Sequence, residues 1–308
     1  MTRVFITMIL ALAMLASCGH KKETTSIDQP KKPTAPVKKP KPVKPKTGLE
    51  EIISPADFKL LLPDSLESIN GEWRRVRDPF YTYEAMLEAA KSFPDFCNTG
   101  TLETRKRELS AFLANTSHET TGGWVSAPKG PFYWGYYYVR EIDSRYYQER
   151  ERRIPYYVDT LGMLAKMYPP APGKHYFGRG PIQISHNYNY GLCSEQLGLG
   201  TQLLESPELV AQDSVLAFKT AIWFWMTRQQ AKPSCHEVMT GQWEPSAHDK
   251  SRGRLPGFGM TINIINGRGE CGRWTHDAKN RIGFYKRYME YFGVSGDGSI
   301  GCESMEPY

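Results

Sequence analysis

Apolar side chains recur at helical spacing along much of the chain beyond residue 80. Helix formers and an apolar stripe predict a helix over residues 81–93, which Pro94 ends. Thr101 can cap a second helix, in which apolar positions recur between charged ones at Leu102, Leu109, Phe112, Leu113 and Thr116. The glycine pair at 122–123 breaks this helix, so we expect Glu119 near its C-terminal end.

Three later segments have patterns of their own. Residues 215–226 are apolar almost all round, which is typical of a central, buried helix. Residues 206–208 (SPE) indicate a helix start with proline at the first position. Residues 182–185 (IQIS) alternate like a short strand and would place Gln183 and Ser185 on the face opposite the two isoleucines. Many helices with a few short strands predict an α+β domain that is predominantly α-helical.

The first 48 residues differ from the rest. A positive start and an apolar run over 4–15, too short to cross a bilayer, are typical of a signal peptide. The run ends in Leu-Ala-Ser before Cys18, which resembles the lipobox of bacterial lipoproteins. This resemblance implies that residues 1–18 are a signal peptide, that Cys18 carries lipid, and that the protein is exported and anchored to a membrane. An ordinary signal peptide with a chance cysteine is the alternative.

Composition divides the rest of the chain, residues 19–308, into a tether, a lead-in segment and a folded domain. Residues 19–48, rich in lysine and proline, predict an extended, disordered tether. Residues 49–78 are a lead-in segment whose apolar side chains can pack on the folded domain, namely Ile52, Ile53, Phe58, Leu60, Leu61 and Leu62. The folded domain would span 79–308. Residues 49–308 carry 29 basic and 31 acidic residues, so the net charge of +6 belongs to the tail. We therefore expect no nucleic-acid partner.

Several kinds of active site are excluded by spacing. A zinc-protease helix needs a second histidine one turn after His118-Glu119, where Gly122 stands instead. The chain has no serine-hydrolase elbow and no phosphate-binding loop, so we expect no metal and no cofactor. Two carboxylates, Glu119 and Glu141, flank a segment rich in aromatic residues. Because aromatic faces stack on sugar rings, this combination favours glycoside hydrolysis.

Four motifs in the same order resemble family 19 glycoside hydrolases, the plant-type chitinases. They are Ala111–Trp124 (AFLANTSHETTGGW), Tyr176–Gly191 (YFGRGPIQISHNYNYG), Phe218–Met226 (FKTAIWFWM) and Asn263–Gly267 (NIING). The similarity covers roughly residues 79–308. It implies a two-lobed, lysozyme-like fold with a long substrate groove.

The resemblance also implies the roles of individual residues. Glu119 would be the general acid of an inverting, endo-acting chitinase, Glu141 the general base, and Ser185 the residue that positions water. Inverting enzymes keep their two carboxyl groups about 6.5–9.5 Å apart. Substrate contacts would come from Thr121, Gln183, Tyr188, Asn189, Asn266, Lys232, Tyr168 and Trp134. His118, Glu270 and Arg281 would support the site, the last two as an ion-pair network around the base.

The chain departs from plant members in two places. Tyr168 stands where a tryptophan that stacks on substrate is usual. The loop Asp143–Met167 is longer and holds four arginines. This loop would either lengthen or partly close the groove, or form a solvated insertion.

Apart from Cys18 the chain has five cysteines, so at least one thiol stays free. The resemblance pairs Cys271 with Cys302 and leaves the partners of Cys97, Cys193 and Cys235 open.

We therefore expect a monomeric enzyme that hydrolyses β-1,4 bonds in chitin or chitooligosaccharides. One alternative is a peptidoglycan hydrolase of the same family, since a lipoprotein faces murein and murein also contains N-acetylglucosamine. A second alternative is a sugar-binding protein that has lost turnover, which the presence of both Glu119 and Glu141 disfavours.

Overall fold

The computed structural model describes residues 48–63, 66–69, 72–75, 80–121, 123–127, 129–141, 162–296 and 298–308. The chain from Pro45 to Tyr308 forms one compact unit. The predicted signal peptide, Cys18 and nearly all of the tether lie outside the described residues, as do residues 143–161 of the arginine-bearing loop. No helix among the described residues is long and apolar enough to cross a membrane.

The lead-in segment packs onto the domain through two short helices, α1 (Leu49–Ile52) and α2 (Pro55–Leu61). Ser54 begins α2 with a capping box, in which its hydroxyl and the Asp57 carboxylate each accept from the other's backbone N–H. The predicted packing residues of this segment are buried except Leu60, which is 54% exposed. The expectation for Leu60 was wrong because consecutive positions on a helix cannot all face the core.

Strands are almost absent from the described residues. β1 (Leu66–Ile69) and β2 (Glu72–Arg75) form one antiparallel hairpin, with Leu66 opposite Arg75. The predicted strand over 182–185 is wrong: this segment is a turn, because Gln183 has a φ of 47° and only Ile184 pairs, with Arg179. The face assignment was nevertheless right, since both isoleucines are buried while Gln183 and Ser185 are half-buried.

The two helices predicted first are present. α3 spans Tyr83–Ala90 and is capped by Thr82, whose hydroxyl accepts from the Ala85 N–H. α4 spans Leu102–Thr121, and Thr101 caps it by accepting from the Thr104 N–H. Residues 108–117 of α4 are buried on every side, so this helix runs through the core.

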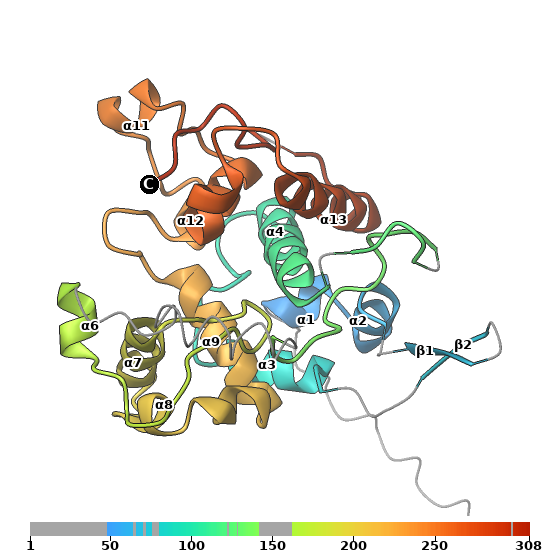
Figure 1. Cartoon of the computed structure of the whole chain (residues 1–308). Helices are drawn as coiled ribbons and strands as arrows, with labels where there is room; N and C mark the ends of the chain where they lie inside the picture. The colour runs from blue at the N-terminus through green and yellow to red at the C-terminus, as the bar shows by residue number, and fades with distance from the viewer. Residues whose placement is uncertain are drawn as a thin grey trace, which may run out of the picture. The chain divides into compact units, whose positions relative to one another are not determined.

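The other helices pack in two groups, with α4 in contact with the second (Figure 1). The first group contains α7 (Asn187–Gln196), α8 (Gln202–Glu205), η1 (Pro207–Ala211) and α9 (Ser214–Met226), which also packs on α3. The second contains α12 (Phe258–Glu270) and α13 (His276–Phe292), and α13 lies along α4. α10 (Cys235–Met239) contacts α4, α9 and α12. The short helices α6 (Met163–Met167) and α11 (Ala247–Ser251) complete the described set.

α9 and the disulfide both match the sequence-based predictions. α9 is the buried central helix that its all-round apolar pattern predicts, with Trp223 and Trp225 inside the core. Cys271 and Cys302 form a disulfide, as the resemblance implied. Cys97, Cys193 and Cys235 are buried free thiols. The disulfide joins the end of α12 to the C-terminal segment and so fixes the turn between α12 and α13.

Candidate active site

The last turn of α4 is fixed by its own threonines and by the segment that follows. The Thr120 hydroxyl donates to the Thr116 carbonyl (2.7 Å) and accepts from the Tyr136 N–H (2.7 Å). The Tyr138 N–H donates to the Thr120 carbonyl (2.8 Å), and the Thr121 hydroxyl donates to the carbonyl of Trp134. These bonds hold the helix end rigid, so the direction in which Glu119 points is set before any ligand arrives.

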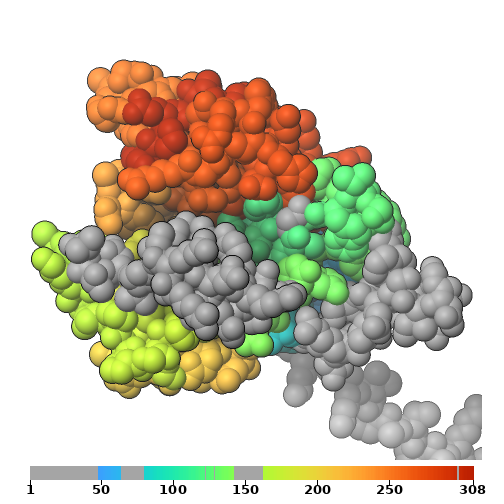
Figure 2. All heavy atoms as spheres, in the orientation of Figure 1, coloured from blue at the N-terminus to red at the C-terminus, as the bar shows by residue number. Residues whose placement is uncertain are grey.

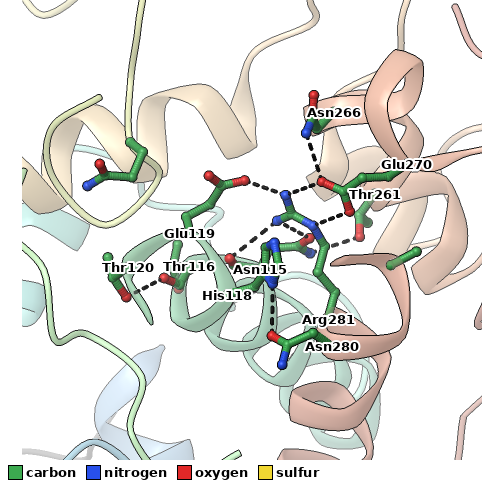
Figure 3. Close-up of polar contacts among 12 residues, drawn as sticks. Asn115, Thr116, His118, Glu119, Thr120, Thr261, Asn266, Glu270, Asn280 and Arg281 are labelled. Atoms are coloured by element: carbon green, nitrogen blue, oxygen red, sulfur yellow. Dashed lines mark hydrogen bonds and ion pairs between the residues drawn. The ribbon is translucent and has the colours of Figure 1, made fainter. Parts of the chain in front are cut away.

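Arg281 lies between two carboxylates (Figure 3). Its side chain is 1% exposed, and it donates to both oxygens of Glu270, at 2.8 and 2.7 Å. The same guanidinium donates to Glu119 Oε1 and to the Asn115 side-chain oxygen, the latter at 3.3 Å. Asn115 in turn donates to the Thr261 hydroxyl (3.0 Å). Residues from α4, α12 and α13 therefore meet at one buried cation.

This arrangement corrects the expectation that Glu270 and Arg281 form a network around the general base. The guanidinium bonds Glu119, the residue assigned as the acid. Sequence order could not reveal this, because Arg281 follows Glu119 by 162 positions. The contact exists because α13 packs along α4 and brings the two side chains to the same level.

The electrostatics of the cluster favour a protonated Glu119. The side chain is 20% exposed, and burial raises its pKa, while the Arg281 charge and hydrogen bond oppose the rise. The net pKa is raised, and Glu270 contributes to the rise. The pKa of Glu270 itself is lowered, because the bonds and charge of Arg281 outweigh its burial. One buried cation thus neutralises one buried anion, and a second anion at Glu119 would be uncompensated.

His118 is a neutral structural neighbour of the acid. Its Nδ1 lies 2.8 Å from the Asn280 side-chain oxygen, which ties α4 to α13. Burial and the nearby Arg281 charge lower its pKa to about 3. An uncharged imidazole here avoids a second positive charge beside Arg281, in keeping with a supporting role.

Glu141 is held by the turn that precedes α7. Its backbone N–H donates to the Gly178 carbonyl (3.0 Å), and the Gly178 N–H donates to its carboxylate (3.0 Å). A Cβ at position 178 would lie 2.8 Å from the side-chain oxygen of Gln183 and 3.3 Å from the Glu141 carboxylate. A side chain at position 178 would thus crowd both neighbours, and the turn brings Glu141 and Gln183 together.

Ser185 lies on the same turn as Gln183, and Asn189 lies in the first turn of α7. The Ser185 hydroxyl donates to the Gln183 carbonyl (3.2 Å), and the Asn189 side chain donates to the Ser185 carbonyl (2.9 Å). The Gln183 side chain donates to the Gly180 carbonyl (2.8 Å). Glu141, the predicted base, and the predicted site residues at 183, 185 and 189 are thus connected through one stretch of backbone.

Asn266 and Lys232 occupy the other side of the site. Asn266 interrupts α12 with non-helical angles (φ −142°, ψ 39°), and its amide donates to the Glu270 carboxylate (2.8 Å). Asn266 therefore belongs to the cluster around Arg281 (Figure 3). The Lys232 side chain is half-buried, and its ammonium donates to the Ile264 carbonyl (2.8 Å), two residues before Asn266.

The model for "Chitinase class I" proteins of glycoside hydrolase family 19 matches residues 61–302. The chain belongs to this family. It is 52% identical over 231 residues to "Endochitinase A2" of Pisum sativum, covering 75% of this chain and 66% of the pea protein. It is also 52% identical over 230 residues to "Inactive chitinase-like protein 1" of Hevea brasiliensis, covering 74% of this chain and 68% of that protein. Among solved structures, chitinase C from Streptomyces griseus HUT6037 aligns with a TM-score of 0.59 at 31% identity, over 82% of this chain and 80% of that one.

Family 19 membership confirms the resemblance seen in the four motifs, and it confirms the predominantly helical, lysozyme-like fold. In the space-filling view, α12 and α13 form one side of the visible face and α6, α7 and α8 the other, with the segment after α4 between them (Figure 2). The predicted groove and the predicted separation of Glu119 and Glu141 stay predictions.

Three aromatic side chains that were expected to contact substrate are buried or half-buried. Tyr168 is 9% exposed, its hydroxyl donates to Glu195, and its ring packs against Gly191 of α7. Trp134 is buried, with its ring centre 6.3 Å from that of Trp124. Tyr188 is half-buried and stacks on His186 at 5.3 Å. Their roles in binding stay predictions, and the structure gives Tyr168 a packing role as well.

Sequence reasoning missed three residues of the cluster: Asn115, Thr261 and Asn280. Each is buried and hydrogen-bonded to a predicted site residue or to another member. A signal did exist, because Asn115 stands among the apolar residues of α4, and a buried amide usually has a specific partner. Nothing in the sequence identified that partner as Arg281.

Proposed function

We propose that this chain is an endo-acting chitinase that hydrolyses β-1,4 bonds between N-acetylglucosamine units with inversion. The observation that carries the proposal is the half-buried Glu119, whose pKa is raised and which shares Arg281 with Glu270. A carboxylic acid that stays protonated near neutral pH can donate its proton to a glycosidic oxygen. The similarity to curated endochitinases supports chitin as the substrate.

In this mechanism Glu119 donates its proton to the oxygen that leaves with the departing sugar. The bond between that oxygen and the anomeric carbon breaks, and positive charge develops on the sugar ring. Arg281 already donates to Glu119, so it stabilises the carboxylate that forms as the proton leaves. The resting network therefore becomes more favourable as the reaction proceeds.

Glu141 acts on the opposite face of the sugar. Its carboxylate accepts one proton from a water molecule, whose oxygen attacks the anomeric carbon and gives an α-anomer. The Ser185 hydroxyl donates to the Gln183 carbonyl, which leaves its oxygen lone pairs free to accept a hydrogen bond from that water. The Gly178 N–H, which bonds the Glu141 carboxylate, fixes the base in place.

The non-catalytic alternative has a specific motivation, since one relative at 52% identity is named an inactive chitinase-like protein. Family membership alone therefore does not establish turnover. The paired arrangement of Glu119 with Arg281 and of Glu141 with Gly178 supports an intact acid and base in this chain. Cleavage of murein is the second alternative, because murein shares the N-acetylglucosamine unit.

The test uses the purified full-length protein with chitin hexamer and, separately, with murein sacculi. We expect α-anomeric products from chitin, detected by NMR early in the reaction. Glu119→Gln should lower turnover by about 10²–10⁴-fold while hexamer binding is retained. Cleavage of murein without cleavage of chitin would contradict the proposed substrate, and full activity of the Gln variant would remove Glu119 from the acid role.

We further propose that Cys18 is lipidated and anchors the exported enzyme to a bacterial membrane. The support is the lipobox-like end of the apolar segment and the lysine- and proline-rich stretch that follows it. Labelling cells with a radioactive or clickable fatty acid should tag the protein, and Cys18→Ala should abolish the label and release the protein from the membrane fraction. Unchanged membrane association of the variant would contradict the anchor.

A further inference from the structure

Trp274 is the most exposed tryptophan whose side chain the structure describes, and it lies in the turn between α12 and α13. Its side chain is 57% exposed, whereas Trp223 and Trp225 lie inside the core. The Lys279 ammonium lies 5.6 Å from the ring centre, so the ring has one cationic neighbour and still exposes more than half of its surface. Exposing a large aromatic side chain forgoes the free energy of burying it.

The backbone that carries Trp274 is firmly held on both sides. Cys271 is bonded to Cys302, and the Gly272 N–H donates to the Cys302 carbonyl (3.0 Å). On the other side, the Thr275 hydroxyl accepts from the Ala278 N–H (3.1 Å) and caps α13. The ring is therefore presented by a rigid turn, which is the arrangement that a stacking surface for a ligand needs.

This turn is part of the frame around the catalytic acid. Glu270 precedes Trp274 by four residues and Arg281 follows it by seven, and these two side chains bond each other beside Glu119. The Thr275 hydroxyl also donates to the Glu270 carbonyl (3.3 Å). The charges of His276 and Asp277 reach His118 and Glu119, so the first turn of α13 lies near the acid.

The segment after α4 approaches the same part of α13. A Cβ at Gly123 would lie 2.7 Å from the Asn280 side-chain nitrogen, so the chain leading into Trp124 contacts α13 directly. Trp124 in turn lies near Trp134. The turn before α13 thus carries the exposed Trp274, and the segment that approaches Asn280 of α13 carries the half-buried Trp124.

We propose that Trp274 is a sugar-stacking residue that binds an N-acetylglucosamine ring of a chitin chain beyond the rings held next to Glu119. This inference rests on the proposed chitinase function. The flat, apolar faces of a β-1,4-linked sugar chain match an exposed indole on a rigid turn. A chain long enough to pass from the acid to the α12–α13 turn gains this contact, and a shorter one does not.

The test compares Trp274→Ala with wild type on chitin tetramer and hexamer. We expect KM for the hexamer to rise about tenfold, equivalent to ~1.4 kcal/mol of binding, with kcat and the tetramer KM changed less than about twofold. Trp274→Phe should recover most of the loss because it keeps an aromatic face. Leu60→Ala, which removes another exposed apolar side chain from α2, is the matched control and should change nothing.

Binding measured in the Glu119→Gln background separates this inference from the proposed function. If wild type fails to cleave the hexamer, the proposed function fails, yet calorimetry with Glu119→Gln and Glu119→Gln/Trp274→Ala still reports whether the indole binds sugar. An unchanged hexamer KM, an equal rise for tetramer and hexamer, or a loss confined to murein binding would each overturn the role proposed for Trp274.

Discussion

The pKa of Glu119 depends on the charge balance of three clustered side chains. Arg281 carries one positive charge and bonds Glu270, while burial raises the pKa of the half-buried Glu119 and the Arg281 charge opposes that rise. The raised pKa thus belongs to the cluster and not to Glu119 alone. A substitution at Glu270 should therefore change the pKa of Glu119 even though Glu119 itself is unchanged.

Glu270→Gln should move the alkaline limb of the pH–activity profile to lower pH. Removing the Glu270 charge leaves Arg281 to act on Glu119 alone, so the pKa of Glu119 falls and less of the acid form is present at neutral pH. We expect this shift in the kcat/KM profile for chitin hexamer, because Glu270 is among the groups that raise the pKa of Glu119. Asp277→Asn is the control, because Asp277 is the weaker contributor, and it should give a smaller shift in the same direction. A shift to higher pH in the Gln variant would contradict this account.

At the scale of elements, the turn before α7 holds Glu141, the proposed base, beside Gly178. Its N–H bonds Glu141, and Gln183 packs where a Cβ would lie. Sequence pattern predicted a strand here because Ile182 and Ile184 alternate with polar residues. The positive φ of Gln183 and of His186 (72°), both costly for residues with a side chain, was not visible in that alternation.

Gly178→Ala should lower kcat/KM by about tenfold or more, since it displaces the side chains of Gln183 and Glu141 by several tenths of an ångström. The melting temperature should change little, because the displaced groups are side chains at a half-buried site. Gly296→Ala is the matched control, as its added Cβ would meet only ordinary contacts at 3.8 Å. Equal activity of the two variants would show that the turn tolerates a side chain and does not fix the base.

At the scale of the whole molecule, a second buried carboxylate joins α4 to the elements around it. Glu108 is fully buried and accepts from the Cys97 N–H (3.1 Å), the Trp225 indole (3.0 Å) and His236 Nδ1 (2.7 Å). Burial alone would lower the pKa of His236, but the bond to Glu108 and its charge outweigh burial, so the pKa is raised. The pair thus couples the packing of α4, α9 and α10 to pH.

The stabilisation from His236 should be fully present below pH ~6.5 and should decline as pH rises through the higher pKa of the folded state. Urea unfolding of wild type and His236→Gln should therefore differ by about 1–3 kcal/mol at pH 6 and by less at pH 9. The exposed His248→Gln provides the control, with no difference at either pH. A difference that grows with pH would contradict the pairing.

The sequence by itself determined the features that depend on nearby residues or on long motifs. Thr101 marks the start of α4, the all-round apolar pattern marks α9 as buried, and the resemblance to family 19 gives the family and the Cys271–Cys302 pair. Only the tertiary structure decided that Arg281 bonds the acid, that Leu60 faces solvent and that residues 182–185 turn. The physical reason is that these outcomes depend on which helix packs against which, and local periodicity does not specify contacts between residues more than a hundred positions apart.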